Sequence, residues 1–185
     1  MEIYSTETFE KLKIRPVDVN SMSSSGKYHY FPKNKKELKE ILLYLIKERG
    51  NNGTFNDIDT STLTDMSYLF RFMVDFNGDI SEWNVSCVTD MNGMFMECEA
   101  FNCSLNNWNI TNVETMEQMF WSCSIFNKPL NNWNVHNVKN MNYMFQNCAR
   151  FNQDLSSWDV KGKEHDDMFD LCPISTKYMP RNIWR

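Results

Sequence analysis

FNGDISEWNVSCVTDMNGMFMECEA, residues 76–100, carries an apolar frame that the chain repeats at an interval of 25 residues. The same frame returns in FNCSLNNWNITNVETMEQMFWSCSI (101–125), in FNKPLNNWNVHNVKNMNYMFQNCAR (126–150) and in the shortened FNQDLSSWDVKGKEHDDMFDLC (151–172). The tryptophans keep this interval most plainly, at Trp83, Trp108, Trp133 and Trp158. A fixed period of this length predicts an array in which each unit buries its apolar face only against its neighbours.

The apolar spacing inside one unit predicts two kinds of local structure. Trp83 and Val85 alternate as in a short strand, and their side chains should point to the same side. The apolar residues that follow step by three, three and one, which favours a 3₁₀ turn or short helix: Val88, Met91, Met94 and Phe95. Because a strand and a short helix in each unit are the plan of a leucine-rich repeat, we expect an α/β repeat fold. It would be a short leucine-rich-repeat-like solenoid with a parallel sheet on one side, short 3₁₀ or α turns on the other, and a capping N-terminal helix.

Shifts in composition divide the chain into four predicted parts. They are an N-terminal segment and linker (1–31), a capping helix (32–51), the tandem repeats (52–172) and a C-terminal cap (173–185). The first part contains an alternating stretch at 12–19 that suggests a short strand, and a serine-rich linker at 21–26. The helix has clear end signals, because Asn34 with Glu37 forms a capping-box-like pair and Gly50 can follow the last turn.

Composition and charge exclude several classes of function. A formal net charge of −5 argues against the basic face that a nucleic acid requires, so no nucleic-acid partner is expected. The sequence has no nucleotide-binding, serine-hydrolase or zinc-protease motif, and we expect no catalytic residue, cofactor or metal. An enzyme hypothesis would need a pocket that gathers His136, His165, Asp166 and Asp167.

The sequence contains no apolar run near the roughly 18 residues that a membrane span requires, so no membrane insertion is expected. Its start, MEIYSTETFEKLK, has acidic residues and no apolar core, unlike a secretory signal peptide. We therefore expect a cytoplasmic protein if the chain is complete, and a cell-surface protein if it is a fragment of a longer one.

Two further columns of the repeat carry polar or reactive side chains. Cysteines share one slot, at Cys98, Cys123, Cys148 and Cys172, where a metal ladder or a disulfide set is the alternative to small buried thiols. The spacing lacks the close pairs of a zinc site, and stacked units would present parallel Cβ vectors, so buried thiols are favoured. The asparagines after each framework phenylalanine predict a structural ladder that satisfies loop backbone groups: Asn77, Asn102, Asn127 and Asn152.

The residues beside the tryptophans are expected to face outward and to form a polar strip rich in amides. An ordinary solvated face is one interpretation, and a hydrogen-bonding surface for a peptide, protein loop or glycan is the other. The candidate partner-binding residues on this strip are Glu82, Asn84, Asn107, Asn109, Asn132, Asn134 and His136. Trp121 is a second candidate, with Met96 in the same slot and Phe72 nearby. If exposed, these groups would mark an interface, and if covered, they would be core.

The repeat FNxxLxxWxVxxVxxMxxMFxxC resembles that of the BspA-type leucine-rich-repeat surface-protein family over about residues 51–172. The helical lead-in from about residue 31 is similar as well. The resemblance implies association with cell surfaces, adhesion and host interaction, and it carries over no catalytic residues. We therefore expect a non-enzymatic protein-interaction module that binds a protein partner through the polar strip or the Trp121 side. The alternative is a surface adhesin fragment that binds a host protein or a glycan.

Overall fold

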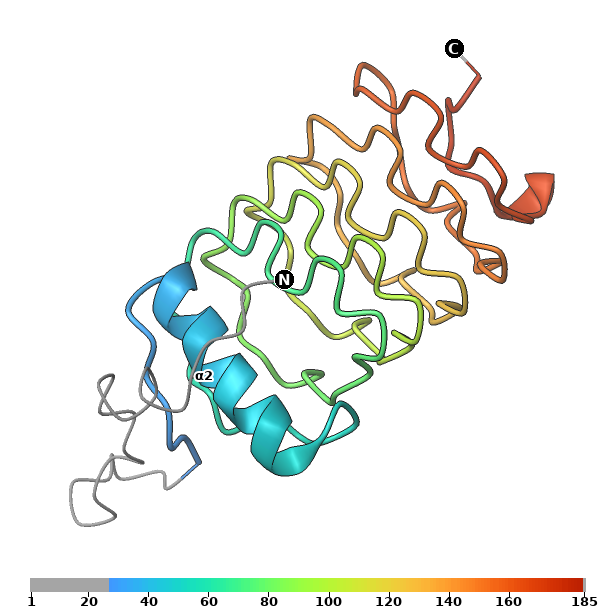
Figure 1. The fold of residues 1–185 in the computed structure, drawn as a ribbon. Coiled ribbons are helices and arrows are strands. Elements are labelled where there is room, and N and C mark those ends of the chain that lie inside the picture. The colour runs from blue at the N-terminus through green and yellow to red at the C-terminus, as the bar shows by residue number, and fades with distance from the viewer. Residues whose placement is uncertain (1–26, 185) are drawn as a thin grey trace.

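The computed structural model describes residues 27–184, so the strand suggested at 12–19 and the linker at 21–26 lie outside the described residues. The helices of this part are the α-helix α2 (Lys35–Arg49) and the short 3₁₀ helix η2 (Thr176–Tyr178). Between them the chain winds in coils that lie one above another, with α2 against one end of the stack (Figure 1). We name each coil by its central core phenylalanine: Phe70, Phe95, Phe120, Phe145 and Phe169.

The helix predicted from the capping signals is confirmed as α2. The Asn34 side chain accepts a hydrogen bond from the Glu37 N–H, and the Gly50 N–H bonds back to the Ile46 carbonyl. The Glu37 carboxylate accepts from the Lys33 N–H at 2.9 Å, one residue earlier than a standard capping box would have it. The inward face of α2 is buried and joins the main core through Leu38, Ile41, Leu42 and Leu45.

The predicted parallel sheet is wrong. The described residues contain no β-strand, and β-type pairing between neighbouring coils is limited to isolated bridges such as Asp65–Asp90. The physical reason lies in the apolar step of three, because it places successive core residues at the two ends of four-residue turns. The Trp83 N–H bonds to the Ile80 carbonyl and the Val88 N–H to the Val85 carbonyl, so the chain bends where the prediction had it extended.

The predicted 3₁₀ or α turns on the opposite side are also replaced by another arrangement. Gly93 and Glu97 have left-handed backbone, with φ of 56° and 59°, which interrupts any helix. Alternate N–H groups in this stretch donate to the next coil, at 2.8–3.0 Å, from Met91, Gly93, Phe95 and Glu97 to the carbonyls of Thr115, Glu117, Met119 and Trp121. The N–H groups between them close turns within their own coil or bond to a side chain.

We call the face of the stack that contains residues 91–97, and the equivalent residues of the other coils, the ladder wall. Its pattern of alternate N–H groups recurs between each pair of coils from Phe70 to Phe169. Every N–H from residue 91 to residue 98 has a partner, so the irregular backbone satisfies the requirement that buried donors be paired.

The tryptophan side of the stack is held together differently. The described structure has no backbone–backbone hydrogen bond between residues 80–86 and 105–111. Instead, buried indole N–H groups cross to the preceding coil: Trp83 bonds to the Phe55 carbonyl at 3.0 Å, and Trp108 to the Ile80 carbonyl at 3.2 Å. The prediction that tryptophan is core and needs an internal acceptor is confirmed for these residues and for Trp133.

Stacked phenylalanine rings fill the centre of the molecule. The rings of Phe70, Phe95, Phe120, Phe145 and Phe169 follow one another with centroids 5.3–5.6 Å apart. A second column, formed by Phe76, Phe101, Phe126 and Phe151, has spacings of 5.9–6.1 Å. Each coil therefore presents the same aromatic surface to its neighbour, which explains why the interval between framework residues is strict.

The asparagine ladder predicted from the sequence is confirmed. The side-chain oxygens of Asn77, Asn102 and Asn127 accept hydrogen bonds at 2.8–3.0 Å from the N–H of the asparagine one coil later. Asn152 accepts in the same way from the Ser175 N–H, so the tail after the last repeat continues the column.

Gly78 provides a test of how tightly the first coils are packed. A Cβ at this position would lie 2.2 Å from a ring atom of Phe55, which is fully buried. We expect Gly78→Ala to lower the free energy of unfolding by about 1–3 kcal/mol, the usual cost of overpacking. Urea unfolding measures this loss. In a Phe55→Leu background the same substitution should cost clearly less, and an equal cost in both backgrounds would show that the two side chains do not collide.

Candidate protein-binding surfaces

The predicted polar residues lie at the surface on the tryptophan side of the stack. We call this set of residues the Trp-side strip. All seven are exposed: Glu82, Asn84, Asn107, Asn109, Asn132, Asn134 and His136. They flank the buried tryptophans, and because the chain bends here, they stand on turns and not on a flat sheet. The structure thus places them together along one side, as predicted, but on turns instead of the predicted strands.

The middle row of the Trp-side strip has a structural task of its own. The side-chain oxygens of Asn84, Asn109 and Asn134 each accept a hydrogen bond, at 3.1–3.2 Å, from the N–H two residues later in the chain. These Asx turns use a lone pair of each amide oxygen. The NH₂ groups of the three amides have no partner among the described residues. The row therefore offers donors to a ligand while its acceptors hold the turns.

One end of the Trp-side strip is hollowed into a pocket of about 420 Å³. Its polar lining includes Asn134, His136, Asp159 and Lys161. Lys163 also lines it and donates from Nζ to the carbonyls of His136 and Val138, at 2.8 and 2.7 Å. Burial lowers the pKa of Lys163 against the opposing effect of Asp159. His165, Asp166 and Asp167 line a different pocket, so the four residues of the enzyme hypothesis are not gathered in one place.

Trp121 on the ladder wall is half-buried, and Met96 in the same slot is buried. The Trp121 indole N–H donates to Oε1 of Gln146 at 2.7 Å, and Nε2 of Gln146 donates to Asp170 at 3.0 Å. The slot that follows the core phenylalanine thus forms a hydrogen-bonded column across several coils. The Trp121 residue remains partly exposed.

An exposed aromatic patch lies on the Phe70 coil, the first coil of the ladder wall, and most of it was not predicted from the sequence. We define this aromatic patch as Tyr68, Arg71, Phe72 and Val74. Phe72 is 53 % exposed and Tyr68 41 % exposed, and both have left-handed backbone that turns them outward from the Phe70 coil. The Arg71 guanidinium stacks on both rings, 4.4 Å from the Phe72 centroid and 5.3 Å from that of Tyr68. Alignment with later repeats would have marked both positions as outward, because the Tyr68 slot holds Gln118 and the Phe72 slot holds Glu97.

The cysteine column is confirmed as a set of buried thiols, with Cys172 only half-buried. The Cys98 thiol donates to the Phe70 carbonyl at 2.9 Å, and Cys123 and Cys148 repeat this contact one and two coils later. Burial raises the pKa of Cys98 to about 12 and that of Cys172 to about 11. Residues 27–184 contain no group of three metal-ligating side chains close enough to hold an ion.

Thiol reactivity tests this arrangement directly. Cys87 is exposed, whereas Cys98, Cys123 and Cys148 are buried and have raised pKa values. Because the thiolate is the reactive form, we expect a maleimide at neutral pH to modify Cys87 quickly and the three buried thiols only after unfolding. Mass spectrometry of native and urea-treated protein gives the measurement. Rapid modification of Cys123 in the native protein would contradict the buried column.

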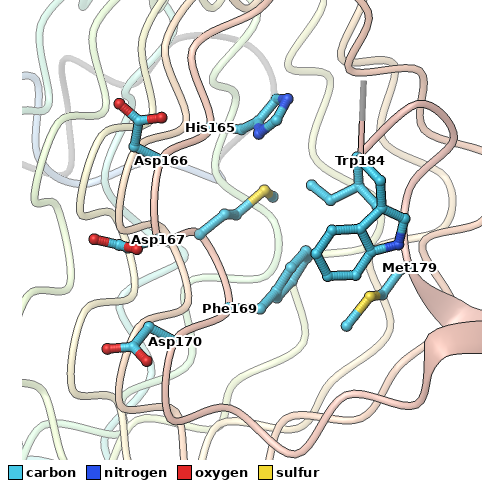
Figure 2. A pocket seen from close by; sticks show the side chains of 9 residues that line it. His165, Asp166, Asp167, Phe169, Asp170, Met179 and Trp184 are labelled. Atoms are coloured by element: carbon cyan, nitrogen blue, oxygen red, sulfur yellow. The ribbon is translucent and has the colours of Figure 1, made fainter.

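A second pocket lies at the C-terminal end of the stack, with a volume of about 400 Å³. It is lined by the last coil and by the tail that follows, and Figure 2 shows Phe169, Met179 and Trp184 gathered on one side. The carboxylates of Asp166, Asp167 and Asp170 lie on the other side of the same stretch of chain. Trp184 and Leu171 are the most exposed apolar residues described, at 79 % and 73 %.

Comparison with known proteins identifies a family. The chain belongs to the family described as "Mycoplasma protein of unknown function, DUF285", whose model matches residues 42–158 and 103–178. This family is associated with BspA-like surface repeat proteins. No curated protein and no solved structure matches the chain. Within the described residues, none of the helices has the length and apolar character to cross a membrane.

Proposed function

We propose that this protein is a non-enzymatic interaction module that binds a protein partner through the ladder wall. The observation that carries the proposal is the aromatic patch, where the Phe72 and Tyr68 rings are exposed and are held apart by a stacked arginine. Tyrosine, tryptophan and arginine are the residues that dominate the binding energy of protein interfaces. Trp121 lies on the same wall, and its polar edge is fixed by Gln146.

The backbone beneath the ladder wall supports this role. Its alternate N–H groups are bonded to the next coil, so the side chains of the aromatic patch stand on a closely hydrogen-bonded surface. Phe72 itself donates its N–H to the Met96 carbonyl at 2.9 Å. A partner that docks here would spend little free energy on ordering this side of the interface.

The second candidate is an adhesin of the BspA type that binds a host protein or a glycan through the Trp-side strip. Two observations favour it: the association of the family with surface repeat proteins, and the row of exposed amides whose NH₂ groups have no described partner. Amide donors of this kind suit sugar hydroxyls and peptide carbonyls. The pocket beside His136 provides a concave place for such a group.

Affinity capture with matched variants separates the two candidates. The bait is the whole chain, exposed to a lysate of the source organism and to an array of host surface proteins and glycans. One variant carries Phe72→Ser with Trp121→Ser, and the other carries alanine at Asn107, Asn109, Asn132 and Asn134. Circular dichroism and thermal unfolding first verify that both variants fold.

The ladder-wall proposal predicts a specific protein that is lost with the Phe72 and Trp121 variant and retained by the asparagine variant. The reverse pattern, or a captured glycan, would favour the adhesin. A partner retained equally by both variants would contradict both surfaces.

A further inference from the structure

Within residues 27–184, the ladder wall ends in a row of N–H groups that have no acceptor. In each earlier coil, alternate N–H groups donate to the following coil, and Met141, Tyr143, Phe145 and Asn147 do so to the carbonyls of Glu164, Asp166, Met168 and Asp170. The same register in the last coil falls on His165, Asp167, Phe169 and Leu171. These four N–H groups have no hydrogen-bond partner among the described residues. Unpaired main-chain edges of this kind accept another polypeptide readily.

The tail of the chain covers only half of this end. The segment that contains η2 pairs with the tryptophan side of the last coil: the Leu155 N–H bonds to the Tyr178 carbonyl and the Arg181 N–H to the Trp158 carbonyl. It thereby takes the place of half a further coil. Over the ladder wall nothing among the described residues follows the Phe169 coil, and the 400 Å³ pocket lies between the free edge and the tail.

The opposite end of the ladder wall is contacted by α2. There the free groups are carbonyls of the Phe70 coil, and Nζ of Lys39 from α2 donates to the Leu69 carbonyl. Lys35, also from α2, contacts the Ser67 hydroxyl and pairs with Asp65 at 2.7 Å. Helix α2 thus supplies cationic donors to the acceptor end, whereas the donor end receives no comparable acceptors from residues 27–184.

The chemistry of the free edge limits which ligands can bind to it. Two copies of this edge cannot pair with each other, because both present N–H donors. On the complementary carbonyl edge of a second copy, the Leu69 carbonyl already accepts from Lys39 of α2. Asp166, Asp167 and Asp170 flank the edge and disfavour an anion. A neutral main-chain carbonyl is an acceptor that these carboxylates do not repel.

We propose that the edge formed by His165, Asp167, Phe169 and Leu171 binds a polypeptide segment of a partner protein by main-chain hydrogen bonds. The segment lays a row of carbonyls along the edge, as each coil of the ladder wall does toward the coil before it. It places apolar side chains in the pocket beside Phe169, Met179 and Trp184, and basic side chains beside the flanking aspartates. This site is separate from the aromatic patch and from the Trp-side strip, so it stands whether or not those surfaces bind a partner.

Selection from a displayed library of random linear peptides supplies the probe, and the tightest binder is then synthesised. We expect it to be rich in lysine or arginine and in apolar residues. Hydrogen exchange followed by NMR on the whole chain should show that the amides of His165, Asp167, Phe169 and Leu171 exchange rapidly when free. They should become protected when the peptide is bound.

Charge reversal adds a matched control. Asp166→Lys with Asp167→Lys should weaken binding of the selected peptide at least about tenfold, since it replaces attraction by repulsion at the edge. Asp75→Lys with Glu99→Lys changes the net charge equally at exposed positions in other coils and should leave the affinity nearly unchanged. Failure to select a peptide, protection of other amides, or equal weakening by both pairs would overturn the proposal.

Discussion

Trp108→Ala is expected to lower the free energy of unfolding by about 3–5 kcal/mol, the range for removing a large aromatic side chain from a core. Trp108 is 3 % exposed, and its ring lies parallel to that of Trp83 with centroids 6.5 Å apart. Its indole N–H is the donor to the Ile80 carbonyl. Because no backbone hydrogen bond joins residues 80–86 to residues 105–111, loss of the ring also removes a principal link between these two coils.

Urea unfolding followed by circular dichroism measures the loss. Trp184→Ala is the matched control, because this tryptophan is 79 % exposed and its removal should change stability by less than about 0.5 kcal/mol. A loss under about 1 kcal/mol for Trp108→Ala would show that the tryptophan column does not hold the coils together.

Phe120→Ala should have an effect of the same size, about 3–5 kcal/mol, for a different reason. Phe120 is fully buried at the crossing of the two ring columns. Its centroid lies 4.3 Å from that of Phe126 in the same coil and 5.5 Å from those of Phe95 and Phe145 above and below. The cavity left by alanine would therefore open to three rings that repeat in register and cannot all shift toward it.

A double-mutant cycle makes this prediction specific. Phe120→Ala and Phe126→Ala remove rings that touch, so we expect their combined cost to differ from the sum of the single costs by about 0.5–3 kcal/mol. Phe72→Ala on the exposed face of the ladder wall should change stability by less than about 0.5 kcal/mol and serves as the control. Additive costs for Phe120 and Phe126 would contradict the stacked columns.

The parts of the fold that could be predicted from the sequence depend on single, strong local signals. Asn34 marks the start of α2 as an N-cap residue, and Gly50 marks its end as a C-cap residue. The structure agrees at both ends. The strict interval of 25 residues assigns the phenylalanine and tryptophan columns to the core, because only stacked equivalent positions require such regularity. The asparagine ladder follows from the same argument.

The local backbone could not be predicted, because the spacing fits two structures. An apolar residue at every third position suits a 3₁₀ turn, and it suits a chain of four-residue turns equally well. The left-handed positions would have decided between them, but residues such as Glu97 and Ser122 occupy them instead of glycine and give no sequence signal. On the tryptophan side, an alternation of only Trp83 and Val85 was too short to define a strand.

The candidate surfaces also divide into features that could be predicted from the sequence and features that could not. The residues of the Trp-side strip were correctly expected at the surface, since they flank buried tryptophans in every repeat. Tyr68 and Arg71 were missed because they belong to the first, imperfect repeat, where the frame is hardest to align. The free donor edge at the Phe169 coil depends on the register of backbone hydrogen bonds, and side-chain spacing alone does not reveal that register.

The ladder wall, and not a sheet on the tryptophan side, carries the main-chain bonds between the central coils. Amide hydrogen exchange measured residue by residue tests it most directly. We predict strong protection at Gly93, Phe95 and Glu97 and at their equivalents in the next coil, because these N–H groups bond across coils inside a packed structure. The amides of Asn84 and Val85, which have no described partner, should exchange quickly. Protection along Asn84 and Val85, with rapid exchange at Gly93 and Glu97, would show that the tryptophan side, and not the ladder wall, carries these bonds.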